Sequence, residues 1–486
     1  MNDIRNLAPQ ALWKHFYSLT RIPRPSGLKE PIGNFLVEFG KSLGLETLQD
    51  ETGNVLVRKP ATPGMEDRKA VILQAHMDMV PQKNTGVKHD FKTDPIETII
   101  DGEWVRAQNT TLGADNGIGV AAAMAVLESK DIPHPAIEML ITVDEETGMY
   151  GAFGLQPNFL QGDILINTDS EDEGELYVGC AGGLDANILF RYQEVEIPEG
   201  DIALKIALTG LNGGHSGVDI HLQRANANKL MFRFLKEAVS DYEVRLASVA
   251  GGSLRNAIPR EAFAVITLPA DAKDEVLELV AGYENLFIAE YKGVEANISF
   301  KAEKTDLPSG LMPEEVQDDL INAVTACPNG VYRMMPEMPS TVETSNNLAV
   351  VVSDGKKIEC KCLIRSSVES RKLELASMIE SVFSLAGAHV EFDNDYPGWQ
   401  PNLQSPILKK MTGVYKKKFG KTPEIMFIHA GLECGILGIH YPEMDMISFG
   451  PTIRYPHSPD EKVNIPSVKK FWEFLLATLT NIPKKQ

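Results

Sequence analysis

The sequence predicts an α/β protein: a mostly parallel central sheet flanked by helices, plus an inserted α+β domain with an antiparallel sheet. Short, predominantly apolar runs are typical of strands buried on both faces of a parallel sheet. Helical stretches such as GVAAAMAVLES lie between these runs, which indicates alternating strands and helices. A long later stretch instead alternates apolar and polar residues, as antiparallel strands with one solvated face do. The four apolar runs are AVILQAH, IEMLITV, DILINTD and MDMISFG.

Taken in order, the chain begins with two amphipathic helical patterns, at about 8–19 and 28–43, separated by the breaker-rich RIPRPSG. The apolar runs follow. From about Leu184 to Val390, strands such as DIALKIALTG and EAFAVITLPA alternate with helical segments such as NANKLMFRFLKEAV. A helix at SPILKKMTGVYKKKFG, further strands and a last helix near 468–479 complete the first domain. We therefore expect a discontinuous domain at 1–186 and 391–486 and an inserted domain at 187–390.

Length and charge limit the classes of function. A chain of 486 residues is too long for one ordinary core, and its formal charge of −20 opposes nucleic acid and anionic membranes. The N-terminus lacks the pattern of a signal peptide, and no apolar run is long enough to span a bilayer. Five cysteines form an odd, sparse set that is typical of reduced thiols. We expect a cytoplasmic enzyme that acts on small molecules, with no nucleic-acid or membrane partner.

Acidic residues and histidines follow the apolar runs of the first domain. Sites in open α/β sheets form outside the carboxyl ends of the strands, so these side chains are expected to converge. Each one alone is ordinary, because a strand-end histidine is usually a surface residue and an acidic turn is usually solvated. Together they are the imidazoles and carboxylates that zinc accepts, and a shared metal site explains them best. They are His76, Asp78, Asp115, Asp144, Glu145, Glu146, Asp169 and His457.

Several longer motifs carry a resemblance to a known family. These are HMD, NTTLGADNGIG, DEETGMYGAFGL, LINTDSEDEGELYVGCAGG, GLNGGHSGVDIHLQRANANKL and GPTIRYPHSPDEKV. Together they resemble the aminoacyl-histidine dipeptidases, also called Xaa-His or carnosinase-like dipeptidases, of the dinuclear zinc metallopeptidase family. HMD and GHSG alone indicate only the wider family, which includes deacylases and carboxypeptidases. The resemblance covers nearly the whole chain.

The resemblance implies two Zn²⁺ ions per chain, with Mn²⁺ or Co²⁺ as substitutes. His76 and Asp169 would bind one ion. Glu146 and His457 would bind the other, and Asp115 would bridge the two. Three carboxylates against two divalent ions leave about one net positive charge, a balance that makes bound water acidic near neutral pH.

The resemblance also implies roles beside the ligands. Asp78 would orient the imidazole of His76. Glu145 would be the general base that takes a proton from a metal-bridged water. In the family, the peptide bond after the bridging aspartate is typically cis, which here is the bond between Asp115 and Asn116.

The inserted domain is expected to act as a lid and to form a homodimer. The resemblance implies that His215, in GGHSG, polarises the scissile carbonyl in its own subunit or in the partner. Asn256 would contact the substrate from the lid. Arg365 would bind the terminal carboxylate of the substrate, for which a planar bidentate donor is suited, and Gly431 would let backbone approach that carboxylate.

The expected activity is hydrolysis of Xaa-His dipeptides, carnosine included, and of other dipeptides. Two alternatives stay open from the sequence. One is an N-acyl amino acid deacylase or another amidohydrolase with the same dinuclear chemistry. The other is a non-catalytic binding protein on the same fold, which would be expected to lack a ligand or Glu145, whereas this chain has them all.

Overall fold

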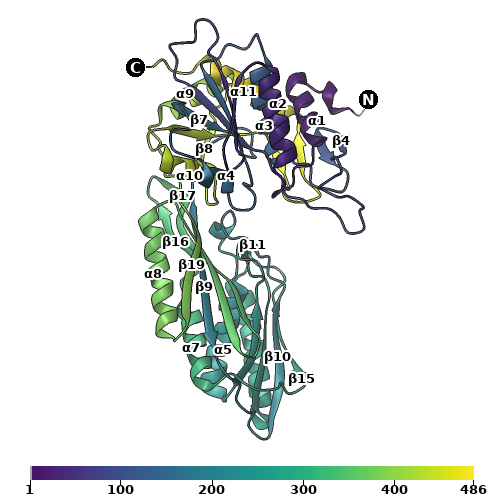
Figure 1. Cartoon of the computed structure of the whole chain (residues 1–486). Helices are drawn as coiled ribbons and strands as arrows, with labels where there is room; N and C mark the ends of the chain where they lie inside the picture. Colours follow the sequence, from purple (N-terminus) through teal and green to yellow (C-terminus); the bar gives the residue numbers. More distant parts are fainter. Residues whose placement is uncertain (1–2, 486) are drawn as a thin grey trace. The chain divides into compact units, whose positions relative to one another are not determined.

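The computed structural model describes residues 3–485, which divide into two compact units (Figure 1). Within these residues, the first unit comprises 3–180, Trp399–Phe427 and 432–485, and the second comprises Ala181–Gly398 and Ile428–Gly431. The first unit holds a sheet with a parallel centre, and the second holds an antiparallel sheet. The predicted fold class is confirmed.

An eight-stranded sheet forms the centre of the first unit. Its four middle strands run parallel to one another, and they are the four apolar runs that the sequence predicts as buried strands. Because the strands are parallel, their carboxyl ends meet at one edge of the sheet. In spatial order the strands are β1 (Glu46–Gln49), β2 (Val55–Lys59), β6 (Ile137–Thr142), β3 (Val71–His76), β7 (Ile164–Asn167), β21 (Asp445–Ser448), β8 (Glu175–Cys180) and β20 (Glu424–Ile428).

The helices of the first unit contribute to its core. Helix α3 is buried from Ala114 to Leu127, so it has no polar face, and its run of alanines fits this enclosed position. The two predicted N-terminal helices are present as α1 (Gln10–Thr20) and α2 (Glu30–Ser42). The remaining helices are α3 (Ala114–Glu128), α4 (Tyr150–Gly154), α9 (Pro406–Phe419), α10 (Glu433–His440) and α11 (Ile465–Thr480). A small sheet comprises β22 (Ile453–Arg454), β23 (Lys462–Asn464), β5 (Trp104–Ala107) and β4 (Thr98–Asp101).

A nine-stranded antiparallel sheet forms the second unit, and its helices share one apolar core with it. Helix α7 is not among the predicted helices, although the spacing of Val316, Leu320 and Val324 is helical. The strands are β9 (Gly182–Arg191), β10 (Asp201–Thr209), β12 (Arg245–Gly251), β14 (Ala262–Pro269), β15 (Ser299–Thr305), β16 (Gly330–Met335), β17 (Met338–Ser353), β18 (Lys357–Ser366) and β19 (His389–Tyr396). The helices are α5 (Ala227–Tyr242), α6 (Lys273–Glu290), α7 (Glu314–Ala326) and α8 (Glu369–Leu385), and β11 (Gly214–His215) pairs with β13 (Ala257–Ile258).

All five cysteines are buried free thiols. Cys360 and Cys362 both face the apolar core from β18, as the alternation around them predicts. Among residues 3–485, no helix combines the length and the apolar character needed to cross a bilayer.

Replacement of Ile447 in β21 by alanine tests the central position of this strand. Ile447 is fully buried in the core of the first unit, so Ile447→Ala should lower the free energy of unfolding by about 2–5 kcal/mol. The matched control is Ile439→Ala in α10, where the side chain is 59% exposed and the change should stay within about 0.5 kcal/mol. Urea unfolding of both variants measures the difference, and equal values would contradict the assigned burial.

Candidate metal centre

The predicted metal ligands of the first unit lie together beyond the carboxyl ends of the parallel strands. His76 is the last residue of β3, Glu146 follows β6, and Asp169 follows β7. Asp115 lies in the first turn of α3. Donor atoms of His76, Asp115 and Glu146 all lie within 4.8 Å of one another. The convergence expected from strand order is therefore present in the structure.

The carboxylate of Asp115 lies between two imidazoles. Its Oδ1 is 3.1 Å from Nε2 of His76, and its Oδ2 is 3.3 Å from Nε2 of His457. The same nitrogen of His76 is 3.2 Å from Oδ1 of Asp169. The same nitrogen of His457 is 2.9 Å from Oε2 of Glu146. The donors thus form two groups that share only Asp115, one oxygen in each group.

The chemistry of these side chains fits bound divalent metal ions. Glu146 Oε1 is buried and has no hydrogen-bond partner within residues 3–485, although an unsatisfied carboxylate oxygen is costly in a protein interior. Imidazole nitrogens and carboxylate oxygens are ligands that zinc and similar ions accept. Two groups of three donors with one shared carboxylate suit a pair of ions.

Asp78 connects the end of β3 to the acidic turn after β6. Nδ1 of His76 lies 3.2 Å from the carbonyl oxygen of Asp78 and 3.4 Å from its Oδ1. The Asp78 carboxylate accepts hydrogen bonds from the Ser26 hydroxyl at 2.7 Å and from the backbone N–H groups of Glu145 and Glu146 at 3.1 and 3.3 Å. One buried carboxylate therefore orients the imidazole of His76 and fixes the backbone of two neighbouring glutamates.

Asn116 fixes Asp169 from the other side. Its Nδ2 donates to the carbonyl oxygen of Thr168 at 2.9 Å and to Oδ1 of Asp169. The backbone N–H of Asp169 donates to Oδ1 of Asn167 at 3.1 Å. The peptide bond between Asp115 and Asn116 is cis, as expected.

A buried polar chain that the sequence analysis missed lies beneath this edge of the sheet. Asn167 Nδ2 donates to Oε1 of Gln74, and Gln74 Nε2 donates to Oε2 of Glu433, each at 2.5 Å. The Thr142 hydroxyl donates to the same glutamate oxygen at 2.7 Å. Burial raises the pKa of Glu433 to about 8, although the hydrogen bond from Thr142 acts in the opposite direction. A polar residue inside an apolar run, such as Gln74 in AVILQAH, was the available signal.

The charges in the centre shift the pKa values of its histidines upward. Burial disfavours the imidazolium of His76, but the carboxylates of Asp169 and Asp115 outweigh it and hold the pKa of His76 well above its usual value. Burial likewise opposes the charge of His457, and the carboxylates of Asp115 and Glu146 raise its pKa to about 11. Before any metal binds, these shifts favour protonated imidazoles, whose positive charge partly compensates the carboxylates.

The acidic groups respond mainly to burial. Burial raises the pKa of Glu145 well above the usual value, His76 opposes this shift, and the charges of Asp169 and Glu146 add to it. Burial also raises the pKa values of Glu146 and Asp169. Burial also acts to raise the pKa of Asp115, but His457 and His76 outweigh this effect, so the pKa of Asp115 is lowered. Among Asp115, Glu146 and Asp169, Asp115 is thus the one whose pKa shift favours the charged form.

In the second unit, His215 lies in β11, which pairs with β13 so that His215 is opposite Ala257. Nδ1 of His215 accepts hydrogen bonds from the backbone N–H groups of Gly217 at 3.2 Å and Val218 at 3.0 Å. A neutral ring that accepts at Nδ1 carries its proton on Nε2, which is then a donor. Asn256 is exposed and directly precedes β13.

Arg365 is buried in β18, where its Nη1 donates to the Tyr396 hydroxyl at 3.0 Å. Its Nε is buried and has no hydrogen-bond partner in the described part of the chain. Gly431 is half-buried in the segment that follows β20. His429, to which the sequence analysis assigns no role, lies two residues earlier with its Nε2 at 2.7 Å from the Ser345 hydroxyl oxygen. Burial, with the charges of Arg365 and His215, lowers the pKa of His429 to about 3.

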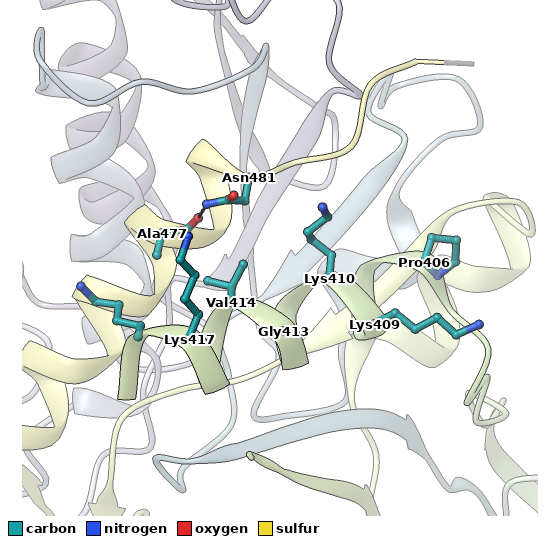
Figure 2. Close-up of a pocket in the computed structure, with 9 residues that line it drawn as sticks. Pro406, Lys409, Lys410, Gly413, Val414, Lys417, Ala477 and Asn481 are labelled. Carbon is teal, nitrogen blue, oxygen red and sulfur yellow. Dashed lines mark hydrogen bonds between the residues drawn. The ribbon is translucent and has the colours of Figure 1, made fainter. Parts of the chain in front are cut away.

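A groove with a cavity volume of about 730 Å³ lies elsewhere in the first unit, between α9 and α11 (Figure 2). Lysines of α9 line it, together with Val414, Ala477 and Asn481. None of the predicted site residues lines this groove. The candidate centre is therefore identified by the short distances between its side chains and not by this groove.

Comparisons with known proteins identify the family. Residues 72–481 match the model of peptidase family M20/M25/M40, and the chain belongs to this family. The chain is 48% identical to the cytosol non-specific dipeptidase of Escherichia coli over 485 residues, which cover 100% of both proteins.

Solved structures extend this result. The crystal structure of aminoacylhistidine dipeptidase from Vibrio alginolyticus is 49% identical, covers 99% of each chain and superposes with a TM-score of 0.91. Aminopeptidase PepT from Bacillus cereus, at 16% identity and a TM-score of 0.58 over 98% of this chain and 99% of its own, shares the fold. The chain is a peptide-bond hydrolase of a metallopeptidase family, and the prediction of a dipeptidase is confirmed by its full-length relatives.

Metal binding to the metal-free protein should release protons at pH 7.5. The pKa of His457 is raised to about 11, so its imidazole is charged at pH 7.5 and must lose a proton to become a ligand, and the pKa of His76 is shifted in the same direction. We expect release of about one proton or more per chain. Calorimetric titration in two buffers of different ionisation enthalpy measures this number. His134→Gln is the control, because burial lowers the pKa of His134 and the number should not change. Metal binding without proton release would contradict the assignment.

Proposed function

We propose that this protein is a dinuclear zinc dipeptidase that hydrolyses Xaa-His dipeptides, β-alanyl-histidine included, and other dipeptides. One observation carries the proposal: each oxygen of Asp115 lies beside a different ligand group, the geometry that a bridging carboxylate needs. The two full-length relatives, named as an aminoacylhistidine and a non-specific dipeptidase, support the choice of substrate.

We assign the ligands as follows. His76 and Asp169 hold one ion, which their 3.2 Å separation supports. Glu146 and His457 hold the other, supported by their separation of 2.9 Å. Asp115 bridges the two ions. Zn²⁺ is the proposed metal because the donors are imidazoles and carboxylates, and Mn²⁺ and Co²⁺ are substitutes that the same donors accept.

When bound, a divalent ion lowers the pKa of water and polarises a peptide carbonyl. Glu145 takes the proton of the attacking water and passes it to the leaving amine. Its backbone is held by the Asp78 carboxylate, and its raised pKa suits proton transfer near neutral pH. Asp78 also keeps His76 in one orientation, so that the imidazole is already oriented for binding before the ion binds.

We propose that residues of the second unit bind the substrate. The Nε2–H of His215 donates to the oxygen that becomes negative as the carbonyl is attacked, and its Nδ1 contacts favour this tautomer. Arg365 binds the terminal carboxylate, and its unsatisfied buried Nε supports a role in binding. Asn256 contacts the substrate from the lid, and Gly431 lets backbone approach the carboxylate.

The wider organisation is proposed on the same basis. The first unit is the catalytic domain, and the second unit is a lid through which the protein forms a homodimer. The boundaries expected at 186/187 and 390/391 fall inside β9 and β19, which are strands of the second unit's sheet. The protein is proposed to act in the cytoplasm, as the name of its Escherichia coli relative says of that protein.

Glu145→Gln should separate catalysis from metal binding. Turnover should fall by roughly 10²- to 10⁴-fold, because the amide cannot take a proton from water. The number of metal ions per chain, measured on the same sample, should stay at two because Glu145 is not a ligand. Glu103→Gln, which removes an exposed carboxylate of the first unit, should leave both quantities unchanged. Full turnover in Glu145→Gln would exclude Glu145 as the base.

A substrate panel tests the proposed activity directly. Metal-free protein should be inactive, and addition of two Zn²⁺ per chain should restore hydrolysis of Xaa-His and other dipeptides. Tripeptides should be poor substrates, because residues that bind both ends of a dipeptide exclude a longer chain. Hydrolysis of N-acetyl amino acids alone would instead show a deacylase. Two bound ions with no hydrolysis of any substrate would favour the non-catalytic alternative.

A further inference from the structure

The carboxylate of Glu461 is buried against the segment that carries Asp115. The residue is 2% exposed and accepts four backbone hydrogen bonds. Oε2 accepts from Leu112 at 2.7 Å and Gly113 at 3.0 Å. Oε1 accepts from Ala114 at 2.7 Å and Asp115 at 3.3 Å. One side chain therefore binds the N–H groups of four consecutive residues, the last of which is Asp115.

The local backbone makes these contacts necessary. The first N–H groups of a helix have no partner within the helix. At the start of α3, Asp115 and Asn116 also depart from helical φ and ψ angles. Gly113 has a φ of 71°, and a side chain there would collide with the Arg24 guanidinium. An anionic group at this helix start satisfies the donors and interacts favourably with the helix dipole.

Arg24 holds the same segment through its carbonyl groups. The residue is 3% exposed, and its Nη1 donates to the carbonyl oxygens of Met77 at 3.1 Å and Asp78 at 3.2 Å. Nη2 donates to the carbonyl oxygen of Gly113. Burial raises the pKa of Glu461 to about 7, although hydrogen bonds from the backbone N–H groups oppose this shift. Burial lowers the pKa of Arg24, and the charge of Glu461 opposes that shift. Gly113 is thus held at its N–H by Glu461 and at its carbonyl oxygen by Arg24.

Glu461 also belongs to the loop that carries His457. This loop connects β22 to β23, and Glu461 directly precedes β23. His457 faces Oδ2 of Asp115 at 3.3 Å, while Glu461, four residues later, is bonded to the Asp115 backbone. Hydrogen bonds to Glu461 therefore connect the segment of Asp115 to the loop of His457, close to the contact between these two side chains.

We propose that Glu461, supported by Arg24, is a positioning residue that fixes Asp115 relative to His457 and thereby sets the affinity of the centre for its metal ions. The inference rests on the ligand assignment under the proposed function. Within residues 3–485, the hydrogen bonds that the Glu461 side chain accepts all come from backbone N–H groups, so its effect on catalysis passes through the geometry of the ligands.

Glu461→Gln tests this role with little change in volume. The amide nitrogen is a donor, so it places an N–H against backbone N–H groups and removes half of the acceptors. Zn²⁺ affinity, measured by competition with a chromophoric chelator, should fall by about 10- to 100-fold. At saturating Zn²⁺ much of kcat should return, with KM for a dipeptide little changed, because no substrate contact is lost.

Glu138→Gln is the matched control. Glu138 is also buried in the first unit, and it accepts hydrogen bonds from the backbone N–H groups of Gln161 at 2.8 Å and Gly162 at 2.9 Å. Its ion-pair partner is Arg58, at 2.8 Å. It lies near the amino end of β6, opposite the edge with the ligands. This variant should lose thermal stability as Glu461→Gln does but keep the Zn²⁺ affinity of the unchanged protein.

Unchanged Zn²⁺ affinity in Glu461→Gln would overturn the proposal, and so would an equal loss of affinity in Glu138→Gln. If Glu461→Gln does not fold, Glu461→Asp decides by the same measurement, since it keeps the charge but cannot reach all four N–H groups. These outcomes are distinct from failure of the proposed function, which would appear in the unchanged protein as absent metal binding or absent dipeptide hydrolysis.

Discussion

The centre depends on the electrostatic balance around one shared carboxylate. Asp115 meets an imidazole at each oxygen, and each imidazole also meets a second carboxylate, from Asp169 or Glu146. Three carboxylates at such short range repel one another unless cations lie among them. The raised pKa values of His76 and His457 favour positively charged imidazoles among these carboxylates, and two divalent ions would supply four positive charges against the same three negative charges. The arrangement therefore favours exchange of protons for metal, which makes affinity depend on pH.

Strand direction is what makes this concentration of charge possible. Parallel strands bring β3, β6 and β7 to one edge at their carboxyl ends, so residues distant in sequence become neighbours. The interior beneath the edge is polar, and hydrogen bonds connect Asn167 through Gln74 to Oε2 of Glu433, whose Oε1 is buried without a hydrogen-bond partner among residues 3–485. With its pKa raised to about 8, Glu433 is mainly neutral at pH 7, so it adds little repulsion to the acidic centre. Rigid strands and a nearly neutral support can thus hold a highly charged site.

The sequence predicts the parts of this structure that follow from periodicity. Four apolar runs become the four parallel strands, and the polar residues after them, such as His76 and Asp169, lie together. These predictions succeed because strand burial and strand direction leave a pattern along the chain. The finer roles, such as the division of ligands between two ions, come from the family resemblance, since spacing alone does not pair His76 with Asp169 rather than Glu146.

Glu461 and Arg24 show why the rest of the site cannot be predicted from the periodicity of the sequence. Their partners are backbone N–H and carbonyl groups, which every residue possesses, so no sequence pattern marks the contacts. A charged residue near a ligand is ordinarily solvated, and only its burial against the Asp115 segment distinguishes Glu461. Candidate ligands can be identified from the chemistry of their side chains. The residues that position them are identified from their hydrogen bonds to backbone N–H and carbonyl groups, which only the structure reveals. A metal centre whose ligands come from separate loops needs both, because a side chain is placed only as well as the segment that bears it.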